Sequence, residues 1–465
     1  MVGIKGTGMS ALAEVLQARG ASVRGSDVAD HFYTEEVLGS LRIPFVNGFS
    51  AANIAGTEDL VVYSAAYDPS SHEELVEAAG RGIPLLSYPE ALGLLSKEAV
   101  STGIAGVHGK TTTTAMTGTI LKALGLPVTV IAGSAARDFG DRSTLLLGGT
   151  YLVAETCEYR RHFLSFHPSC VVITSVEPDH LDYFRDYDDI LSAFVAYGRS
   201  LPPGGVLIYC ADDIGACQAA EGIAEGRGDL TLTPYGEKAS GAFRIQEISA
   251  GTGETRFRLQ GMRVPFSLHV PGSHNVKNAA AAAAAAGRIL EQERGVCTEA
   301  DEKVISRALA DFRGTRRRSE IVGEAGGILF MDDYGHHPTA METTLKGLKD
   351  FYGNRRIVVD FMSHTYSRTK KLLPDFASSL TYADAVVLHK IYASAREKDS
   401  GRVTGRDLYK AVRDLREEVY YFEEVMDALP FLQGFLQAGD LFITMGAGDN
   451  WKLCHALYSA FGGQS

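Results

Sequence analysis

Short apolar runs alternate with amphipathic stretches along most of the chain, and this alternation predicts β-strands followed by α-helices. Near the start, the runs VGI, LVVYSAA and IPLLSYP are separated by stretches such as MSALAEVLQARG, where apolar residues recur at helical spacing. Strands that alternate with helices form βαβ units on a parallel sheet. We therefore expect an α/β fold from the first residues onward.

The alternation restarts twice, which predicts further domains. A second series begins near residue 99, with the strands TYLVAE, CVVITSV and GGVLIYC, and a third begins at GGILFMDD. Between them, residues 230–270 hold short strand-like pieces that we interpret as an antiparallel insert or a sheet edge. Eight alanines at 279–286 predict a buried helix without chemistry. We predict three α/β domains, at residues 1–98, 99–316 and 317–465.

Composition narrows the class of protein. A chain of 465 residues is too long for one compact core, and 22% charged residues are typical of a globular protein. The formal net charge of −12 argues against a nucleic-acid surface. The six cysteines include no C-x-x-C pair, so we expect free thiols and no zinc site. The sequence holds no long apolar run and no signal peptide at its start, so we expect a cytoplasmic protein without a membrane segment.

The first candidate site is a glycine loop at the start of the chain. Gly3, Gly6 and Gly8 follow a short apolar run and precede a helical stretch, and Asp27 ends the next strand. Such glycines let the backbone approach a diphosphate at a helix N-terminus, and the acid suits a ribose or a base. The spacing is G-x-x-G-x-G rather than G-x-G-x-x-G. At this point a tight turn, or a dinucleotide site in an NAD-dependent oxidoreductase, remains open.

A second, more specific loop reads GVHGKTT at 106–112, between an apolar strand and a helix. Its glycine-rich backbone can cradle phosphates, Lys110 can neutralise phosphate charge and Thr111 can bind Mg²⁺. The full G-x-x-x-x-G-K-T pattern is incomplete, because Ile104 stands at the position of the first glycine. We predict a nucleotide-phosphate loop.

Acidic residues follow the next two apolar strands of this domain. Glu155 ends the run TYLVAE and Glu158 follows it, and Glu177, Asp179 and His180 come after CVVITSV. Because ligands bind outside the carboxyl ends of parallel strands, these groups should lie beside the phosphate loop. Carboxylates suit hard Mg²⁺, which accepts an imidazole less often. A lone histidine is more often a hydrogen-bonded residue than a ligand, but this position favours His180 as a ligand.

Three polar clusters follow apolar strands in the last third of the chain. They are DDYGHHP at 332–338, HTYSR at 364–368 and GAGD at 446–449, and an arginine run occupies 316–318. Singly, each is more typical of a solvated loop or linker than of a site. Together, they place many polar side chains at strand ends.

The whole set of motifs resembles the Mur ligase family, in that family's order and over the whole chain. The shared elements are the first glycine loop with Ser26-Asp27, GVHGKTTTT at 106–114, EPDHLDY at 177–183, His274-Asn275, Arg317-Arg318, DDYGHHP, YSRT at 366–369, residues 395–397 and GAGD. DDYGHHP and YSRT resemble the branch that acts on UDP-N-acetylmuramate. The other elements are shared more widely with Mur and folylpolyglutamate ligases.

The resemblance implies a Rossmann-like UDP-binding domain, a central P-loop ATPase domain and a mobile Rossmann-like C-terminal domain. It implies ATP-dependent ligation of L-alanine to the lactyl carboxylate of UDP-N-acetylmuramic acid through an acyl phosphate. This reaction belongs to peptidoglycan precursor synthesis, and so to cell-wall growth, cell shape and cell division. It also implies two Mg²⁺ ions, which Mn²⁺ can replace, and we expect a monomer or a weak homodimer.

The resemblance also implies roles for individual residues. The catalytic residues would be Lys110, Glu155, His180, His336 and Arg368, and the metal ligands Thr111, Glu155 and His180. ATP would be held by Gly106, His108, Gly109, Lys110, Thr111, Thr112, His274, Asn275, Arg317 and Arg318. The UDP-sugar would meet Gly6, Thr7, Gly8, Asp27 and Ser64, and the amino acid Tyr334, His336, His364 and Arg368.

Five positions depart from the family pattern: Val107, Cys157, Ser319, Ser363 and Thr365. They affect contacts with the substrates more than the class of reaction. The main alternative activity is ligation of a whole tripeptide to the same UDP-sugar. A nucleotide-binding protein without ligase activity is a third interpretation. The presence of Lys110, Glu155, His180, His336 and Arg368 argues against it.

Overall fold

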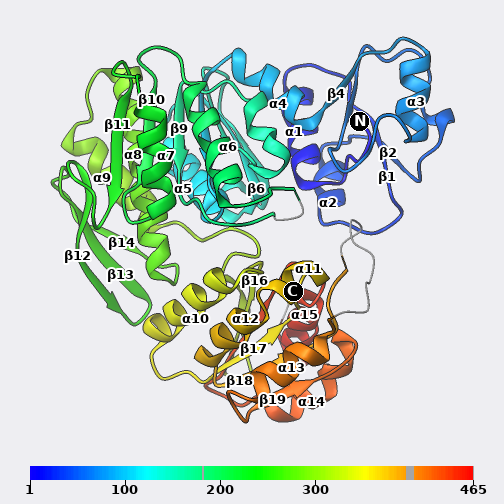
Figure 1. Ribbon diagram of the computed structural model, residues 1–465, viewed down its shortest axis with the longest axis vertical. Helices are drawn as coiled ribbons and strands as arrows, with labels where there is room; N and C mark the ends of the chain where they lie inside the picture. The colour runs from blue at the N-terminus through cyan, green and yellow to red at the C-terminus, as the bar shows by residue number, and fades with distance from the viewer. Residues whose placement is uncertain (181–182, 394–402, 464–465) are drawn as a thin grey trace. The chain divides into compact units, whose positions relative to one another are not determined.

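The computed structural model describes residues 1–180, 183–393 and 403–463. They form two compact units, which we describe separately. The first comprises Met1–Glu247, Phe257–Phe266 and Lys277–Phe312, and the second Ile248–Arg256, Ser267–Val276 and Arg313–Ser465. Both contain parallel strands connected by helices (Figure 1), so the predicted α/β class is confirmed. Within the described residues, no helix is both long and apolar enough to cross a membrane.

The first hundred residues build a small parallel β-structure around Val2. Val2 bridges in parallel to Ser26 on one side and to Tyr63 on the other. It thereby connects two two-stranded parallel sheets, β1-β2 and β3-β4. The elements are α1 (Thr7–Ala18), β1 (Gly25–Asp27), α2 (Thr34–Ser40), β2 (Phe45–Asn47), η1 (Ala51–Asn53), β3 (Val61–Tyr63), α3 (Glu73–Gly80), β4 (Leu85–Ser87) and α4 (Tyr88–Lys97).

A ten-stranded sheet follows, in the order β14-β13-β12-β11-β10-β9-β5-β8-β6-β7. Its centre is parallel and largely buried, which explains the apolar runs of β8 and β9. The sheet strands are β5 (Val100–Ala105), β6 (Val128–Ala136), β7 (Arg142–Leu146), β8 (Tyr151–Glu155), β9 (Cys170–Ile173), β10 (Val206–Cys210), β11 (Thr231–Gly236), β12 (Phe243–Gly251), β13 (Glu254–Leu259) and β14 (Phe266–Leu268). The helices between and after them are α5 (Lys110–Ala123), η2 (Arg137–Phe139), η3 (Tyr159–Ser165), α6 (Tyr187–Arg199), α7 (Ile214–Ala224), α8 (Ser273–Arg294) and α9 (Glu299–Ala310).

Two expectations about this sheet have clear outcomes. The segment 230–270 is the edge of the sheet, and its first strand β11 pairs in parallel with both β10 and β12. The other interpretation of this segment was an antiparallel insert, and the parallel pairing of β11 does not agree with it. The alanines at 279–286 lie in α8 and are at most 2% exposed. Alanine allows such close packing, as the sequence predicted.

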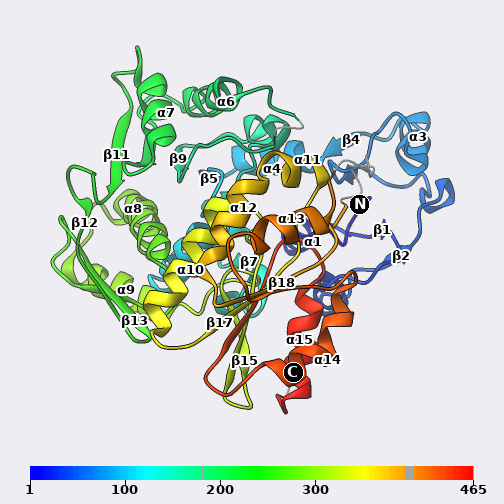
Figure 2. The same ribbon diagram turned by 60° about the horizontal axis from the view of Figure 1, so that its bottom comes forward.

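The C-terminal sheet has the order β15-β16-β20-β17-β18-β19, and only β15 is antiparallel. Alternate residues of its strands enter two separate cores. One core includes Val359 and packs against α10, α12 and α13, whereas the other includes Val358 and packs against α14 and α15. These two sets of helices lie on opposite faces of the sheet (Figure 2). The elements are β15 (Glu320–Ala325), β16 (Ile328–Asp333), α10 (Pro338–Tyr352), β17 (Ile357–Phe361), α11 (Tyr366–Lys371), α12 (Leu373–Ser379), η4 (Leu380–Tyr382), β18 (Ala385–Leu388), α13 (Gly405–Arg413), β19 (Val419–Tyr421), η5 (Val425–Ala428), α14 (Leu429–Phe435), β20 (Leu441–Met445) and α15 (Trp451–Ala460).

Candidate active site

The first glycine loop leads directly into α1. Gly6 precedes the helix, and Thr7 is its first residue and accepts a hydrogen bond from the Tyr33 hydroxyl at 3.1 Å. A Cβ on Gly8 would lie 2.8 Å from the Tyr88 ring, so only glycine fits there without a shift. The loop can thus bring backbone N–H groups and a helix N-terminus to an anion.

Asp27 and Ser64 lie beside this loop, at the ends of β1 and β3. The Asp27 carboxylate accepts a hydrogen bond from the backbone N–H of Lys5 at 2.6 Å, which fixes the loop against β1. The Ser64 N–H donates to the Val2 carbonyl at 2.9 Å, at the end of β3. The structure therefore brings Gly6, Thr7, Gly8, Asp27 and Ser64 to one edge of this small sheet.

The phosphate loop connects β5 to α5, and two glycines determine its course. Gly106 has φ +134° and Gly109 has φ +82°, a region that other residues rarely adopt. A Cβ on Gly109 would lie 2.5 Å from the side-chain oxygen of Asn278, so a side chain there would clash as well as strain the backbone. The helix begins at Lys110, with Thr111 and Thr112 in its first turn.

His108 lies at the middle of the loop and connects it to the next strand end. Its N–H donates to Ser175 Oγ at 2.9 Å, and its carbonyl accepts from the Thr174 hydroxyl. Its Nε2 lies 2.9 Å from Glu177 Oε1. These contacts hold the loop against the residues that follow β9.

Lys110 makes an ion pair with Glu158. The Glu158 side chain is almost completely buried. The ammonium lies 2.9 Å from Glu158 Oε2, and it also donates to the carbonyl of Gly106. Burial by itself lowers the pKa of Lys110, but the charge and hydrogen bond of Glu158, together with the other acidic groups nearby, raise it. Burial likewise favours a raised pKa for Glu158, yet Lys110 and His180 hold that pKa below its usual value. Both groups are therefore charged at neutral pH.

Thr111, Glu155 and His180 lie around this ion pair. The Thr111 hydroxyl donates to Glu155 Oε2 at 2.7 Å, and His180 Nε2 lies 3.5 Å from Glu158 Oε1. His180 has φ +51°, an unusual backbone conformation of the kind that often marks functional sites. Hydroxyl and carboxylate oxygens with one imidazole form a donor set that fits a hard divalent cation. Two of the predicted metal ligands, Thr111 and Glu155, thus contact each other, and the third, His180, contacts Glu158 beside Lys110.

Sequence reasoning missed two residues here. Glu158 was noted at the strand end, but Glu155 alone was expected to be functional, whereas Glu158 contacts Lys110 and His180. Asn278 of α8 lies against Gly109, and it accepts a hydrogen bond from the Thr113 hydroxyl at 3.3 Å. Lys110, directly after Gly109, could have signalled a buried acid, but nothing in the sequence pointed to Asn278.

His274 and Asn275 lie in the first turn of α8. The amide of Asn275 donates to the Pro271 carbonyl at 2.7 Å, which closes the turn before the helix. The His274 ring lies against Gly272, where a Cβ would overlap the imidazole. A planar ring beside a backbone turn is a surface on which a base can stack.

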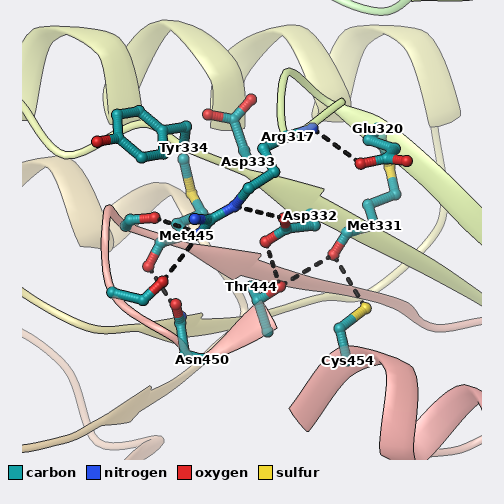
Figure 3. A network of polar contacts seen from close by, with 12 residues as sticks. Arg317, Glu320, Met331, Asp332, Asp333, Tyr334, Thr444, Met445, Asn450 and Cys454 are labelled. Atoms are coloured by element: carbon teal, nitrogen blue, oxygen red, sulfur yellow. Dashed lines mark hydrogen bonds and ion pairs between the residues drawn. The ribbon is translucent and has the colours of Figure 1, made fainter. Parts of the chain in front are cut away.

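Arg317 lies at the centre of a polar network in the second unit (Figure 3). Its guanidinium lies 2.9 Å from Asp332 and donates to the carbonyls of Gly446 and Gly448, at 2.8 and 3.1 Å. Burial raises the pKa of Asp332, and Arg317 opposes that shift. Arg318 lies beside it, with its guanidinium 5.3 Å from the centre of the Tyr334 ring. Arg317 is thus tied to the GAGD loop, while both arginines lie near Tyr334.

The residues predicted to bind the amino acid form one cluster at the ends of β16 and β17. The rings of Tyr334 and His336 lie 5.1 Å apart, and those of His336 and His364 lie 5.9 Å apart. Arg368 Nη1 lies 3.4 Å from His364 Nδ1. The cluster combines a cation with aromatic and imidazole groups, which suits a small zwitterion. Residues 181–182 and 395–397 of the family motifs lie outside the described residues.

Three family models match almost the whole chain. The model of the Mur ligase family catalytic domain matches residues 1–99, and that of the Mur ligase middle domain matches residues 104–286. The model of the Mur ligase glutamate ligase domain matches residues 317–448. The glycine loop, the phosphate loop and the C-terminal cluster each lie inside a different match.

Curated relatives and solved structures agree with these matches. A protein named UDP-N-acetylmuramate–L-alanine ligase from Treponema pallidum is 52% identical over 99% of this chain and 96% of its own length. One with the same name from Borreliella burgdorferi is 40% identical over 97% of this chain and 96% of its own. The structure of the UDP-N-acetylmuramate–alanine ligase from Thermotoga maritima, at 28% identity, matches 99% of this chain and 98% of its own, with a TM-score of 0.80.

Proposed function

This chain belongs to the Mur ligase family, and from that membership we propose that it joins L-alanine to the lactyl carboxylate of UDP-N-acetylmuramic acid at the expense of ATP. The product is a precursor of peptidoglycan. The substrates follow from the names of relatives that are up to 52% identical over nearly the full length of both chains.

One observation supports phosphoryl transfer as the type of reaction. Lys110 and Thr111 begin the helix after the phosphate loop, and Glu155, Glu158 and His180 surround them. Phosphoryl transfer needs positioned charges more than it needs a covalent catalyst. A buried lysine among carboxylates, at the N-terminus of a helix, supplies such charges.

In the proposed first step, a lactyl carboxylate oxygen attacks the γ-phosphorus of ATP. The bond between the γ-phosphorus and the bridging oxygen breaks, and ADP leaves. Lys110 would turn from Glu158 to the γ-phosphate, whose negative charge competes for the same ammonium. The backbone N–H groups of Gly109 and of the first turn of α5 would hold the other phosphate oxygens.

Thr111, Glu155 and His180 would hold Mg²⁺, and Glu158 joins them as a candidate ligand. Bound there, Mg²⁺ would neutralise phosphate charge, and a second ion would serve the other end of the displacement. Mn²⁺ prefers similar ligands and would substitute. The protein's own part is to keep the carboxylates ionised, which Lys110 does for Glu158.

In the second step, the amine of L-alanine attacks the carbonyl carbon of the acyl phosphate, and phosphate leaves from the tetrahedral intermediate. Arg368 would pair with the carboxylate of the amino acid, since a guanidinium binds a carboxylate bidentately. His336 lies between Tyr334 and His364, where a neutral imidazole would accept a proton from the amine. Exclusion of water would protect the acyl phosphate from hydrolysis.

The tripeptide-adding alternative has less support. The murein peptide ligase from Psychrobacter arcticus is 24% identical with a TM-score of 0.67, a likeness that concerns the fold alone. We further propose that the enzyme works in the cytoplasm, as a monomer or a weak homodimer, on substrates that are neither nucleic acid nor membrane-bound.

A coupled assay of ADP release tests the proposal. ADP should form only when ATP, UDP-N-acetylmuramic acid and L-alanine are all present, because the phosphate moves only to a bound carboxylate. ADP release at the same rate without the UDP-sugar would refute the ligase assignment. Turnover with L-Ala-γ-D-Glu-diaminopimelate but not with L-alanine would transfer it to the tripeptide ligase.

A further inference from the structure

Besides the amino-acid cluster (Tyr334, His336, His364 and Arg368), the second unit holds another group of polar side chains that the proposed reaction does not use. Asp360 is the penultimate residue of β17, His389 is the first residue after β18, and Asn450 is the last residue before α15. All three are at most 1% exposed. A buried polar group costs stability unless it is hydrogen-bonded, so such a group usually has a purpose beyond packing.

Hydrogen bonds join the three side chains, with Asp360 between His389 and Asn450. His389 Nε2 lies 2.6 Å from Asp360 Oδ2, and its Nδ1 lies 3.1 Å from the Phe422 carbonyl. The Asn450 amide group donates to Asp360 Oδ1 at 2.9 Å and to the Met445 carbonyl at 3.0 Å. Because both of these partners only accept, the orientation of the Asn450 amide is determined.

The partners of His389 determine which of its ring nitrogens carries a proton. The Phe422 carbonyl can only accept, so Nδ1 of His389 carries a proton. Burial alone lowers the pKa of His389, but the Asp360 charge and the hydrogen bonds with Asp360 and Phe422 raise it, with a smaller contribution from Asp449.

Each member of the network anchors one loop that ends near the amino-acid cluster. Asp360 lies four residues before His364, and His389 lies three residues before Tyr392. The two loops pair directly: Tyr392 N–H donates to the Ser363 carbonyl at 2.8 Å, and Thr365 N–H donates to the Tyr392 carbonyl at 3.1 Å.

The rings of the same two loops also meet. His364 and Tyr392 stack with centroids 5.9 Å apart and an interplanar angle of 26°. Asn450 donates to the Met445 carbonyl, directly before the third loop, GAGD at 446–449. Gly446 and Gly448 of that loop pack closely on Met362. Figure 3 shows Asn450 directly below the segment after Met445.

We propose that Asp360, His389 and Asn450 are positioning residues that hold His364 and Tyr392 in place for the amino-acid substrate. None of them reaches the cluster itself, so they act through the backbone of the three loops. This assignment rests on the proposed function of the cluster. A displacement of about 1 Å in a positioning group can cost roughly 10²-fold in rate, so a buried network four residues away can control affinity.

Steady-state kinetics of two Asp360 variants test this network. Asp360→Ala should raise KM for L-alanine about 10-fold or more, with KM for ATP and for the UDP-sugar within about two-fold of wild type. Asp360→Asn should rescue most of this loss, because its amide can donate to a neutral His389 while its oxygen still accepts from Asn450. If Asp360→Ala does not fold, Asn450→Leu carries the same expectation, since it removes the Asn450 donors and leaves the contact between His389 and Asp360.

The control variant is Ile357→Ala, which opens a cavity at the other end of β17. It should lower the melting temperature without changing KM for L-alanine. An equal change in KM for Ile357→Ala and Asp360→Ala would overturn the proposal and make the network merely structural.

Hydrogen exchange gives a second readout that does not depend on activity. The amides of Thr365 and Tyr392 should exchange faster in Asp360→Ala than in Ile357→Ala, because only the first variant releases the paired loops. Unchanged exchange at both amides would overturn the proposal. Absence of L-alanine-dependent turnover in wild type would instead refute the proposed function, and the exchange result would still decide whether the network holds the loops.

Discussion

Replacement of Lys110 by alanine should affect catalysis and stability through two separate mechanisms. In catalysis, the variant lacks a cation at the γ-phosphate, where one such group in a dehydrated site is worth ~10²–10³-fold in rate, or about 3–4 kcal/mol. In the free enzyme, the same change leaves Glu158 as a buried carboxylate, 1% exposed, without its main partner. Breaking one side of a buried ion pair costs roughly 3–5 kcal/mol.

The pH dependence separates these mechanisms. In wild type, Lys110 and His180 hold the pKa of Glu158 below its usual value although burial opposes them. Glu158 therefore contributes stability that is present above its unfolded pKa and is lost as the pH falls through its folded pKa. Without Lys110, burial dominates and raises the pKa of Glu158. As the pH falls, protonation of Glu158 then removes the unpaired buried charge that destabilises the variant. The difference in melting temperature between wild type and Lys110→Ala should therefore narrow as the pH falls from 8 to 5.

A double variant completes the test. Lys110→Ala with Glu158→Gln should recover most of the melting temperature at pH 8, because no buried charge remains, whereas ADP release should stay as low as in Lys110→Ala. The control is Lys122→Ala in the same helix, whose exposed ammonium donates to the Asp138 carbonyl and should matter little. A pH-independent difference in melting temperature, together with no recovery in the double variant, would refute the role of Glu158. Activity within a factor of two of wild type in Lys110→Ala would show that the loop is not the ATP site.

Three further predictions concern the metal and the amino acid. His180→Ala should raise the Mg²⁺ concentration that gives half-maximal activity, and an unchanged titration would remove His180 from the ligands. Arg368→Lys should raise KM about equally for L-alanine, glycine and L-serine, because it alters the carboxylate contact that all three share; unequal effects in a steady-state comparison would place Arg368 near the side chain instead. Wild type should prefer L-alanine, with lower kcat/KM for glycine and L-serine by an amount worth ~1–3 kcal/mol per methyl or hydroxyl, and equal kcat/KM values would contradict a fitted pocket.

The sequence by itself determined the features that depend on local patterns. The alternation of apolar runs and helical stretches predicted the α/β class, because side-chain periodicity reflects secondary structure directly. The motif GVHGKTT predicted a glycine turn between a strand and a helix, and the structure has β5, the turn and α5 there. The strand-end position of DDYGHHP likewise predicted that its polar residues would gather at one edge of a sheet.

Only the tertiary structure decided which side chains meet. Glu155 ends β8 and Glu158 follows it, and the local sequence cannot tell which of them contacts Lys110, because that depends on how the chain turns after β8. Asp360, His389 and Asn450 are separated by 29 and 61 positions, and they meet because β17 lies between β18 and β20. The pairing order of strands is determined by packing across the whole sheet, a long-range property that no local pattern of residues contains.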